Sequence, residues 1–214
     1  MHVKLYSYFR SSAAYRVRIA LNLKGLNADL IPVHLLNNGG EQHSIAYKAI
    51  NPAELVPTLV EDDFYLSQSL SILEYLNERY PEVDLLPQDP QQRALVRAFS
   101  LAIACDIHPL NNLRVLQYLT DHLQISDQQK TTWYSHWVEQ GFATLEAMLI
   151  ASNGQFCFGK QASFADCCLI PQVYNALRFN IDMSAYPKIL AVYQHCNTLV
   201  AFQEAAPEAQ QDAA

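Results

Sequence analysis

The first eighty or so residues alternate between strand-like and helix-like patterns of hydrophobic and polar positions. Short apolar runs bounded by polar or breaking residues predict strands, and apolar residues recurring every three or four positions predict helices. The expected strands are 3–6, 30–33, 58–60 and 64–66, and the expected helices are 12–24, 42–48 and 68–80. The pair Asp62-Asp63 predicts a tight hairpin between the last two strands. Together these elements indicate a mixed sheet with helices.

After a proline-rich stretch the pattern changes to helical periodicity alone. Apolar residues recur at helical spacing: Leu95, Phe99, Ile103, Trp133, Trp137, Leu145, Leu149, Leu169, Val173 and Leu177. We therefore expect an α/β domain over residues 1–81, a linker over 82–89 and an all-helical domain over 90–214. The polar, alanine-rich end is expected to be a frayed tail from about residue 205.

Composition narrows the classes of partner. Half of the 214 residues are hydrophobic and 16% are charged, so the chain has enough apolar surface to bury a core. A net charge of −7 argues against nucleic acid and anionic membranes as partners. The apolar runs are too short to span a bilayer, and the segment 1–5 shows no hydrophobic leader. Five cysteines without CxxC spacing fit reduced thiols, so we expect a cytoplasmic protein.

Several common kinds of site have no motif in this chain. The six glycines form no dinucleotide fingerprint or phosphate loop, and the seven histidines have no metal-ligand spacing. No GxSxG elbow occurs. We therefore expect no metal site.

The first positive signal is a pair of serines, Ser11 and Ser12, between a predicted strand and a predicted helix. A hydroxyl and free backbone N–H groups at the positive end of a helix can stabilise a thiolate or a carboxylate. Serine at this place is also an ordinary N-cap. The pattern alone leaves both interpretations open.

The second signal combines Val56-Pro57 with Gln68-Ser69. A cis proline entering a strand would turn the N–H and C=O of Val56 outward to pair with an extended peptide. Ser69, at the start of the next helix, can offer its hydroxyl and N–H to a carboxylate. The alternative is a plain proline turn followed by an N-cap.

Taken together, these motifs and the helical second half resemble a cytosolic glutathione transferase. The run from Arg10 to Leu21 is similar to the zeta class, whose recognised activity is maleylacetoacetate isomerase. The resemblance covers nearly the whole chain and extends to further segments: 51–57, 106–113, 164–167 and 178–182. It implies an N-terminal thioredoxin-like domain followed by an all-α C-terminal domain.

The resemblance also implies roles for single residues. Ser11 would hydrogen-bond the sulfur of the cofactor glutathione, with Ser12 beside it. The other implied glutathione-binding residues are Gln42, Val56, Gln68, Ser69, His108 and Asn112, with Leu113 next to them. The class usually has cysteine after the serine pair, whereas this chain has Ala13, which puts thiol-exchange activity in doubt.

The implied activity is isomerisation of maleylacetoacetate to fumarylacetoacetate in aromatic amino acid catabolism, by a homodimer that recycles glutathione. The substrate is a dianion, and each carboxylate favours a planar guanidinium. The resemblance assigns this binding to Arg10, Arg114 and Arg178, and makes Arg10 catalytic together with the two serines. Arg16 and Arg18 are expected to be surface or helix-end charges.

Other functions remain open at this point. Arg114 is similar to bacterial maleylpyruvate isomerases, and the same site suits conjugation of glutathione to halogenated acids. A non-catalytic interaction module with this fold is the alternative from another class. A disulfide oxidoreductase is disfavoured because no cysteine precedes Cys105.

Three remaining features are expected to be structural. Ser163 to Asp166 reads as a capping box, and Cys167 and Cys168 lie on an apolar helix. Trp133 and Trp137, one turn apart, are expected to pack against the core.

Overall fold

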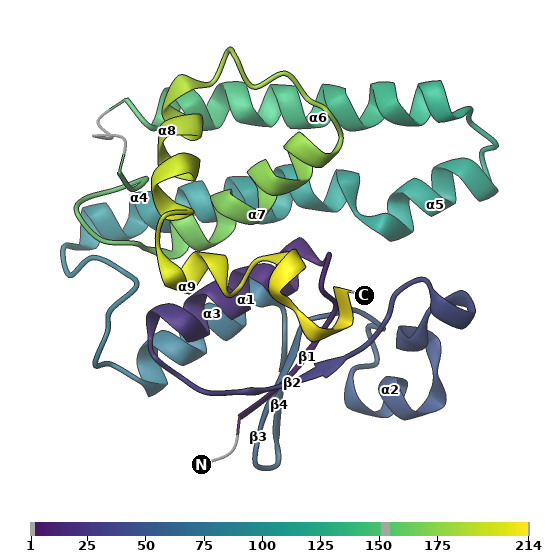
Figure 1. The fold of residues 1–214 in the computed structure, drawn as a ribbon, viewed down its shortest axis with the longest axis horizontal. Helices are drawn as coiled ribbons and strands as arrows, with labels where there is room; N and C mark the ends of the chain where they lie inside the picture. The colour runs from purple at the N-terminus through teal and green to yellow at the C-terminus, as the bar shows by residue number, and fades with distance from the viewer. Residues whose placement is uncertain (1–2, 151–154, 214) are drawn as a thin grey trace. The chain divides into compact units, whose positions relative to one another are not determined.

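The computed structural model describes residues 3–150 and 155–213, which form two compact units (Figure 1). The first unit joins residues up to 85 with the C-terminal segment from 197 onward, and the second covers 86–196. The first contains a mixed sheet with helices and the second is helical, so the predicted fold class is confirmed.

The sheet of the first unit has the strand order β2-β1-β3-β4. Its strands are β1 (Val3–Ser7), β2 (Asp29–Pro32), β3 (Thr58–Glu61) and β4 (Phe64–Ser67). β1 is parallel to β2 and antiparallel to β3, and β3 is antiparallel to β4. Leu5 and Leu59 face each other in the register of β1 and β3, and both are fully buried. The mixed sheet and its hairpin therefore follow the predicted pattern.

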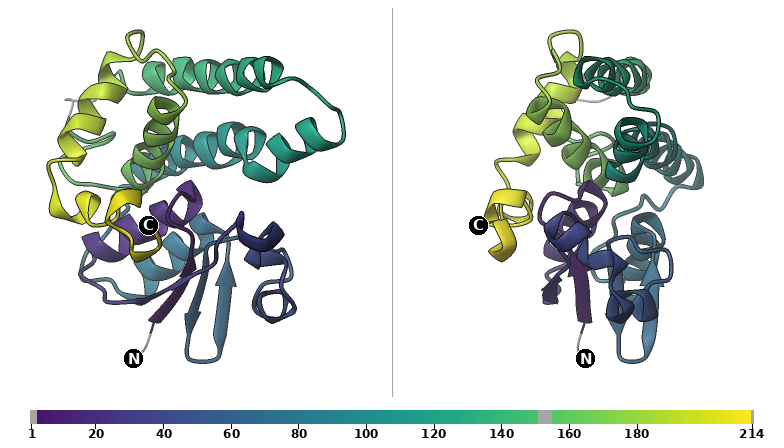
Figure 2. Two further views of the ribbon diagram at one scale, coloured as in Figure 1. Left: turned by 45° about the vertical axis from the view of Figure 1, so that its right-hand side comes forward. Right: turned by 90° about the vertical axis from the view of Figure 1, so that its right-hand side faces the viewer.

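Two helices cover one face of this sheet and a third covers the other (Figures 1 and 2). α1 (Ser12–Leu23) packs against α3 (Ser69–Arg79), and α2 (Ile45–Ile50) lies on the opposite side of the sheet. Every residue of α1 from 14 to 21 is buried, which fixes the start of the helix in place. The predicted helix 42–48 is divided into η2 (Glu41–His43) and α2, because Ser44 caps a new helix.

The C-terminal segment packs on α1, so the prediction of a frayed tail is wrong for the described residues. Its elements are α9 (Val200–Gln203), η5 (Pro207–Ala209) and η6 (Gln211–Ala213). Phe202 is fully buried, and Gln210 donates from Nε2 to two backbone carbonyl oxygens at 2.9 Å each. The polar side chains that suggested fraying satisfy backbone groups within the first unit, to which this segment belongs.

The second unit is built from helices and helical turns. They are α4 (Pro90–Leu101), the π-helix η3 (Ala102–Ile107), η4 (His108–Asn111), α5 (Leu113–Asp121), α6 (Asp127–Met148), α7 (Phe164–Arg178) and α8 (Pro187–Cys196). α6 approaches η3 closely at Gly141, where an added Cβ would collide with the side chain of Ile107. None of the described helices is long and apolar enough to cross a membrane.

Two structural predictions for this unit are confirmed, the capping box and the buried cysteines. Asp166 is fully buried and accepts hydrogen bonds from the N–H groups of Ser163 and Cys157, both at 2.8 Å. This is the predicted capping box, extended by one further backbone bond. Cys167 and Cys168 are buried in the core, and all five cysteines of the chain carry free thiols.

Candidate active site

The serine pair lies where β1 turns into α1. The turn closes with a hydrogen bond from Ser11 N–H to the carbonyl oxygen of Tyr8 at 2.9 Å. Ser11 is the N-cap of α1, and its Oγ accepts the N–H of Ala14 at 3.2 Å. A hydroxyl has one proton to donate and two lone pairs. The cap occupies a lone pair and leaves the proton of Ser11 available, so capping and thiol binding do not compete.

Ser12 is the first residue of α1 and is buried. It therefore lies in the first turn of the helix, where N–H groups lack intrahelical acceptors and the helix dipole favours an anion. The two serines together place one half-buried hydroxyl at the positive end of a fixed helix.

Arg10 is exposed and its guanidinium lies over the ring of Phe9, 4.9 Å from the ring centroid. Phe9 in turn contacts Tyr8 edge-on, with centroids 4.8 Å apart, and His34 at 6.4 Å. Cation–π contact with an aromatic cluster holds the arginine beside the turn while leaving its N–H groups in solvent.

Gln42 lies on η2 and is only 7% exposed. Its Nε2 is 3.0 Å from Nε2 of His43, whereas its Oε1 is buried without a hydrogen-bond partner among the described residues. Gly40 is necessary for this arrangement, because a Cβ there would collide with the amide of Gln42. A buried carbonyl oxygen is costly unless water or a ligand supplies a donor.

The peptide bond between Val56 and Pro57 is cis, which is the first of the two alternatives that the sequence left open. A buried polar network fixes Leu55, the residue before Val56. The Tyr47 hydroxyl and the Asn51 amide both donate to its carbonyl oxygen, at 2.7 and 2.8 Å. Burial raises the pKa of Tyr47 above its ordinary value, so the hydroxyl stays protonated and able to donate. The sequence did not predict this network, although Asn51 lies in the segment 51–57 that resembles the zeta class.

The start of α3 carries the other pair of predicted residues. Gln68 is the N-cap, and its side chain makes no capping hydrogen bond to the helix. Its φ of 71° lies in the left-handed region, where residues with a Cβ are strained. Ser69 is buried in the first position of the helix. These features suit a helix end that receives a carboxylate.

Two arginines of α1 are buried, so their prediction as surface or helix-end charges is wrong. Arg16 and Arg18 are each 2% exposed. Arg16 donates from Nη1 to Ser69 Oγ at 3.1 Å, and Arg18 donates to the carbonyl oxygen of Phe9 at 3.0 Å. Burial lowers the pKa of Arg18 to about 10, which still leaves it charged at neutral pH. Arg16 thus holds Ser69, and Arg18 holds the turn before Ser11. The sequence signal that could have predicted their burial is the presence of two arginines on an otherwise apolar helix.

In the second unit, His108 and Asn112 lie one helical turn apart around η4. Asn112 Nδ2 is 3.3 Å from His108 Nε2, and Asn112 Oδ1 caps α5 by accepting the N–H of Arg114 at 3.1 Å. Trp133 of α6 donates from its indole to the carbonyl oxygen of Leu110 at 2.8 Å. The structure thus brings these two predicted residues together and gives Trp133 a specific role in holding their turn.

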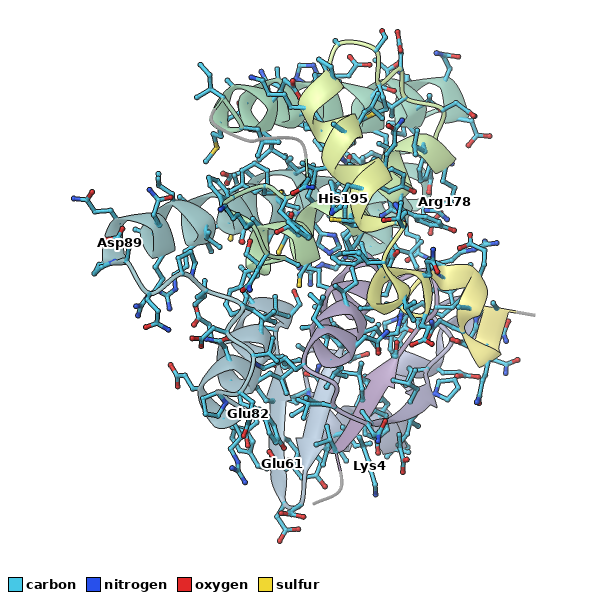
Figure 3. All side chains as sticks on the ribbon, turned by 60° about the vertical axis from the view of Figure 1, so that its left-hand side comes forward. Lys4, Glu61, Glu82, Asp89, Arg178 and His195 are labelled. Carbon is cyan, nitrogen blue, oxygen red and sulfur yellow. The ribbon has the colours of Figure 1, made fainter. Side chains whose placement is uncertain are left out.

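Arg178 is the last residue of α7 and is exposed (labelled in Figure 3). Its guanidinium lies over the ring of Phe179, 4.8 Å from the centroid. Phe179 stacks on Tyr134 with centroids 3.9 Å apart. Burial raises the pKa of Tyr134 to about 12, so this ring stays uncharged beneath the arginine. Arg10 and Arg178 therefore share one local arrangement, an exposed guanidinium on a neighbouring phenylalanine.

The predicted residues divide between the two units. Arg10, Ser12 and five of the seven predicted glutathione-binding residues lie in the first unit, and His108, Asn112, Arg114 and Arg178 lie in the second. The convergence of the arginines on one substrate stays a prediction. Within the described parts of the chain, no group of three or more histidines, cysteines or acids is placed to hold a metal.

Comparison with known proteins identifies relatives over the whole chain. Residues 5–84 match the family model described as glutathione S-transferase, N-terminal domain. The chain is 50% identical to a probable maleylacetoacetate isomerase of Vibrio cholerae, over 100% of this chain and 99% of that protein.

Solved structures of similar proteins belong to the same family. One is a maleylpyruvate isomerase described as a bacterial zeta-class glutathione transferase, 43% identical with a TM-score of 0.94, covering 99% of this chain and 100% of that one. Another is a maleylacetoacetate isomerase of Methylobacterium extorquens with bound malonate and glutathione, 38% identical with a TM-score of 0.92, covering 99% of each chain.

Proposed function

Since the chain belongs to the zeta-class glutathione transferases, we propose that it isomerises maleylacetoacetate to fumarylacetoacetate with glutathione as its cofactor. It is an enzyme of the glutathione-dependent cis-trans isomerase type. The observation that carries the proposal is the Ser11 hydroxyl, which caps α1 through a lone pair and keeps its proton for a thiolate.

The residues of the first unit fit glutathione. Gln42 offers a buried Oε1 without a partner among the described residues, which suits an N–H donor of the tripeptide. Val56, before a cis proline, is proposed to pair with the peptide backbone, and the start of α3 at Gln68 and Ser69 to receive the γ-glutamyl carboxylate. His108 and Asn112 are proposed to complete the site from the helical unit.

Bound glutathione supplies a thiolate that adds reversibly to one carbon of the cis double bond, so that rotation about the resulting single bond and loss of the thiolate give the trans product. The Ser11 hydroxyl donates to the sulfur, and the N-terminus of α1 at Ser12 favours its negative charge. A free thiol has a pKa of about 8.5, so both effects raise the thiolate fraction at neutral pH.

The arginines are proposed to bind the two carboxylates of the substrate and to stabilise the charge that develops on its carbonyl oxygen. Arg10 and Arg178 are both exposed and both supported by a phenylalanine ring. The Methylobacterium extorquens relative was solved with malonate, likewise a dicarboxylate, and glutathione bound, which supports binding of a dicarboxylate by this fold.

Maleylpyruvate is the second candidate substrate. It is favoured by Arg114, which is exposed in the first turn of α5 and adds a third guanidinium for a compact dianion. The similarity to a solved maleylpyruvate isomerase supports it as well.

The deciding experiment compares kcat/KM for the two substrates with pure protein and glutathione. We expect a higher value for maleylacetoacetate. A clear preference for maleylpyruvate would replace the first proposal by the second, and turnover of neither would contradict both. In that case calorimetry with glutathione separates an enzyme for another electrophile from a non-catalytic interaction module, which would not bind.

We also propose a cytoplasmic homodimer that acts in aromatic amino acid catabolism. The five free thiols suit a reducing compartment. Light scattering after gel filtration tests the dimer, which would have about twice the chain mass of 24.2 kDa. Because Ala13 replaces the cysteine usual for the class, we expect weak thiol-exchange activity.

A further inference from the structure

A buried arginine joins the turn before Ser11 to the C-terminal segment. The Arg18 guanidinium donates from Nη1 to Ser7 Oγ and from Nη2 to the carbonyl oxygen of Phe9, both at 3.0 Å. Its Nε donates to the carbonyl oxygen of Ala205 at 2.9 Å. One side chain therefore connects the end of β1, the turn and the tail of the same unit.

Asp212 of η6 completes this connection. Its Oδ2 accepts the N–H of Phe9 at 3.0 Å. Phe9 is a central residue of the turn that Ser11 N–H closes on Tyr8. Both backbone polar groups of Phe9 are thus held from outside the turn, the C=O by Arg18 and the N–H by Asp212. A bond from an N–H to a carboxylate is charge-assisted and roughly twice as strong as a neutral one.

The segment that carries Asp212 is itself anchored. Phe202 is fully buried, and its carbonyl oxygen accepts the Tyr15 hydroxyl at 3.5 Å. Asn22 of α1 donates from Nδ2 to the carbonyl oxygen of Ala201 at 2.9 Å. These contacts tie the tail to the same helix whose first turn carries Ser12, so the carboxylate approaches Phe9 from a fixed support.

We propose that Asp212 is a positioning residue for the thiol site, which acts through the Phe9 N–H to hold the turn that orients the Ser11 hydroxyl. The proposal rests on the function proposed above. Small displacements of a catalytic group have large effects on rate, up to about 100-fold for 1 Å. A residue 201 positions away in the sequence from Ser11 thereby contributes to catalysis without touching substrate or cofactor.

The test uses the full chain with Asp212→Ala and Asp212→Asn. In the free protein, amide hydrogen exchange at Phe9 should be about tenfold faster in Asp212→Ala, because its N–H loses the acceptor. With glutathione, ultraviolet titration of the thiolate should give a higher pKa for the bound thiol. Turnover should fall about tenfold while the KM for glutathione changes by less than about twofold.

Asp212→Asn separates the hydrogen bond from the charge. Its carboxamide oxygen still accepts the Phe9 N–H in a weaker, neutral hydrogen bond, so exchange and turnover should lie between those of Asp212→Ala and wild type. Loss of the negative charge alone would act in the opposite direction on the bound thiol, since removing a nearby anion lowers a thiol pKa. The matched control is Asp89→Ala, which removes a carboxylate that accepts the Gln92 N–H at 2.9 Å in the second unit.

Unchanged exchange at Phe9 and unchanged turnover in Asp212→Ala would overturn the proposal. An equal loss of turnover in Asp212→Ala and Asp212→Asn would overturn it too. So would an equal loss of turnover in the control Asp89→Ala. Failure of the proposed function can be distinguished from failure of the role proposed for Asp212. Amide exchange needs no ligand, and the thiol titration needs glutathione but no maleyl substrate. A wild-type protein that isomerises neither substrate would leave those two measurements to decide the role of Asp212.

Discussion

Arg16 donates a hydrogen bond from Nη1 to the hydroxyl of Ser69 at 3.1 Å, and both side chains are buried. The bond joins the middle of α1 to the first residue of α3. The helix that begins at the proposed thiol site therefore also orients the serine proposed to bind the far end of glutathione. The two ends of the proposed cofactor site are linked through one buried guanidinium.

Arg16→Lys should weaken glutathione binding more than it slows turnover. Lysine keeps the charge but loses the planar fork that reaches Ser69. We expect the KM for glutathione to rise about tenfold, as for loss of a hydrogen bond to a charged group, with kcat within about twofold. Steady-state kinetics at saturating substrate measure both. The control is Arg93→Lys, whose arginine hydrogen-bonds the carbonyl oxygens of Pro87 and Gln88 in the second unit. A tenfold loss of kcat at constant KM would contradict this role.

Ser11→Ala should reduce turnover about 100-fold, the effect expected on losing a donor to a developing anion. Glutathione affinity should fall by less than about threefold, because the tripeptide keeps its other contacts. The variant also loses an N-cap, which costs about 1 kcal/mol of unfolding free energy. Ser126→Ala is the matched control, since Ser126 caps α6 by accepting the Gln129 N–H at the same 3.2 Å. It should lose similar stability and keep its kcat. Equal kcat in both variants would remove Ser11 from the mechanism.

The sequence predicted the elements because each has a local signal, and it failed where distant segments meet. The strand and helix patterns around Ser11 and the proline after Val56 were sufficient for the sheet and its turns. Periodicity cannot show that Arg16 and Arg18 are buried, because their partners come from other elements and from the tail. The prediction for the tail failed for the same reason. Its composition indicated fraying, but Asp212 accepts a hydrogen bond from Phe9, which is distant in the sequence.

Gln68 offers a test of strain at the proposed cofactor site. Its φ of 71° is costly for a residue with a Cβ, so Gln68→Gly should raise the thermal midpoint by about 2 °C. The same change removes the side chain proposed to contact glutathione, so the KM for glutathione should rise severalfold. Asp62→Gly is the control, because Asp62 is exposed in the β3–β4 turn with a φ of 53°. It should gain the same stability without a change in KM. A Gln68→Gly protein that binds glutathione as well as wild type would refute the contact.

Phe179→Leu tests the support of Arg178. Leucine keeps an apolar side chain but loses the ring over which the guanidinium lies and which stacks on Tyr134. Cation–π contact at an exposed site is worth about 0.5–1 kcal/mol, so the KM for the maleyl substrate should rise about threefold, with glutathione binding unchanged. Phe158→Leu is the control, since Phe158 contacts Phe99 in the same unit. An equal rise in both variants would show a general packing effect instead of a role for Arg178.

Glu61 predicts how the stability of the first unit depends on pH. Burial by itself would raise the pKa of Glu61, but hydrogen bonds from the hydroxyls of Tyr75 and Tyr80 and the charge of Arg79 lower it below its ordinary value of 4.5. Figure 3 labels this carboxylate at the end of the sheet beside the β3–β4 turn. A carboxylate whose pKa is lower in the folded state contributes stability above its unfolded pKa. That contribution is lost as the pH falls through the folded value.

Urea unfolding of wild type and Glu61→Gln from about pH 7 to about pH 3 measures this contribution. The difference in unfolding free energy should be largest above about pH 4.5 and should shrink as the solution becomes more acidic, because the protonated wild type and the glutamine variant then have the same charge. Asp63→Asn removes an exposed carboxylate from the neighbouring turn and is the control. A difference that stays constant across the range would mean that Glu61 acts through shape and hydrogen bonding alone. Its charge would then add nothing to the stability of the sheet.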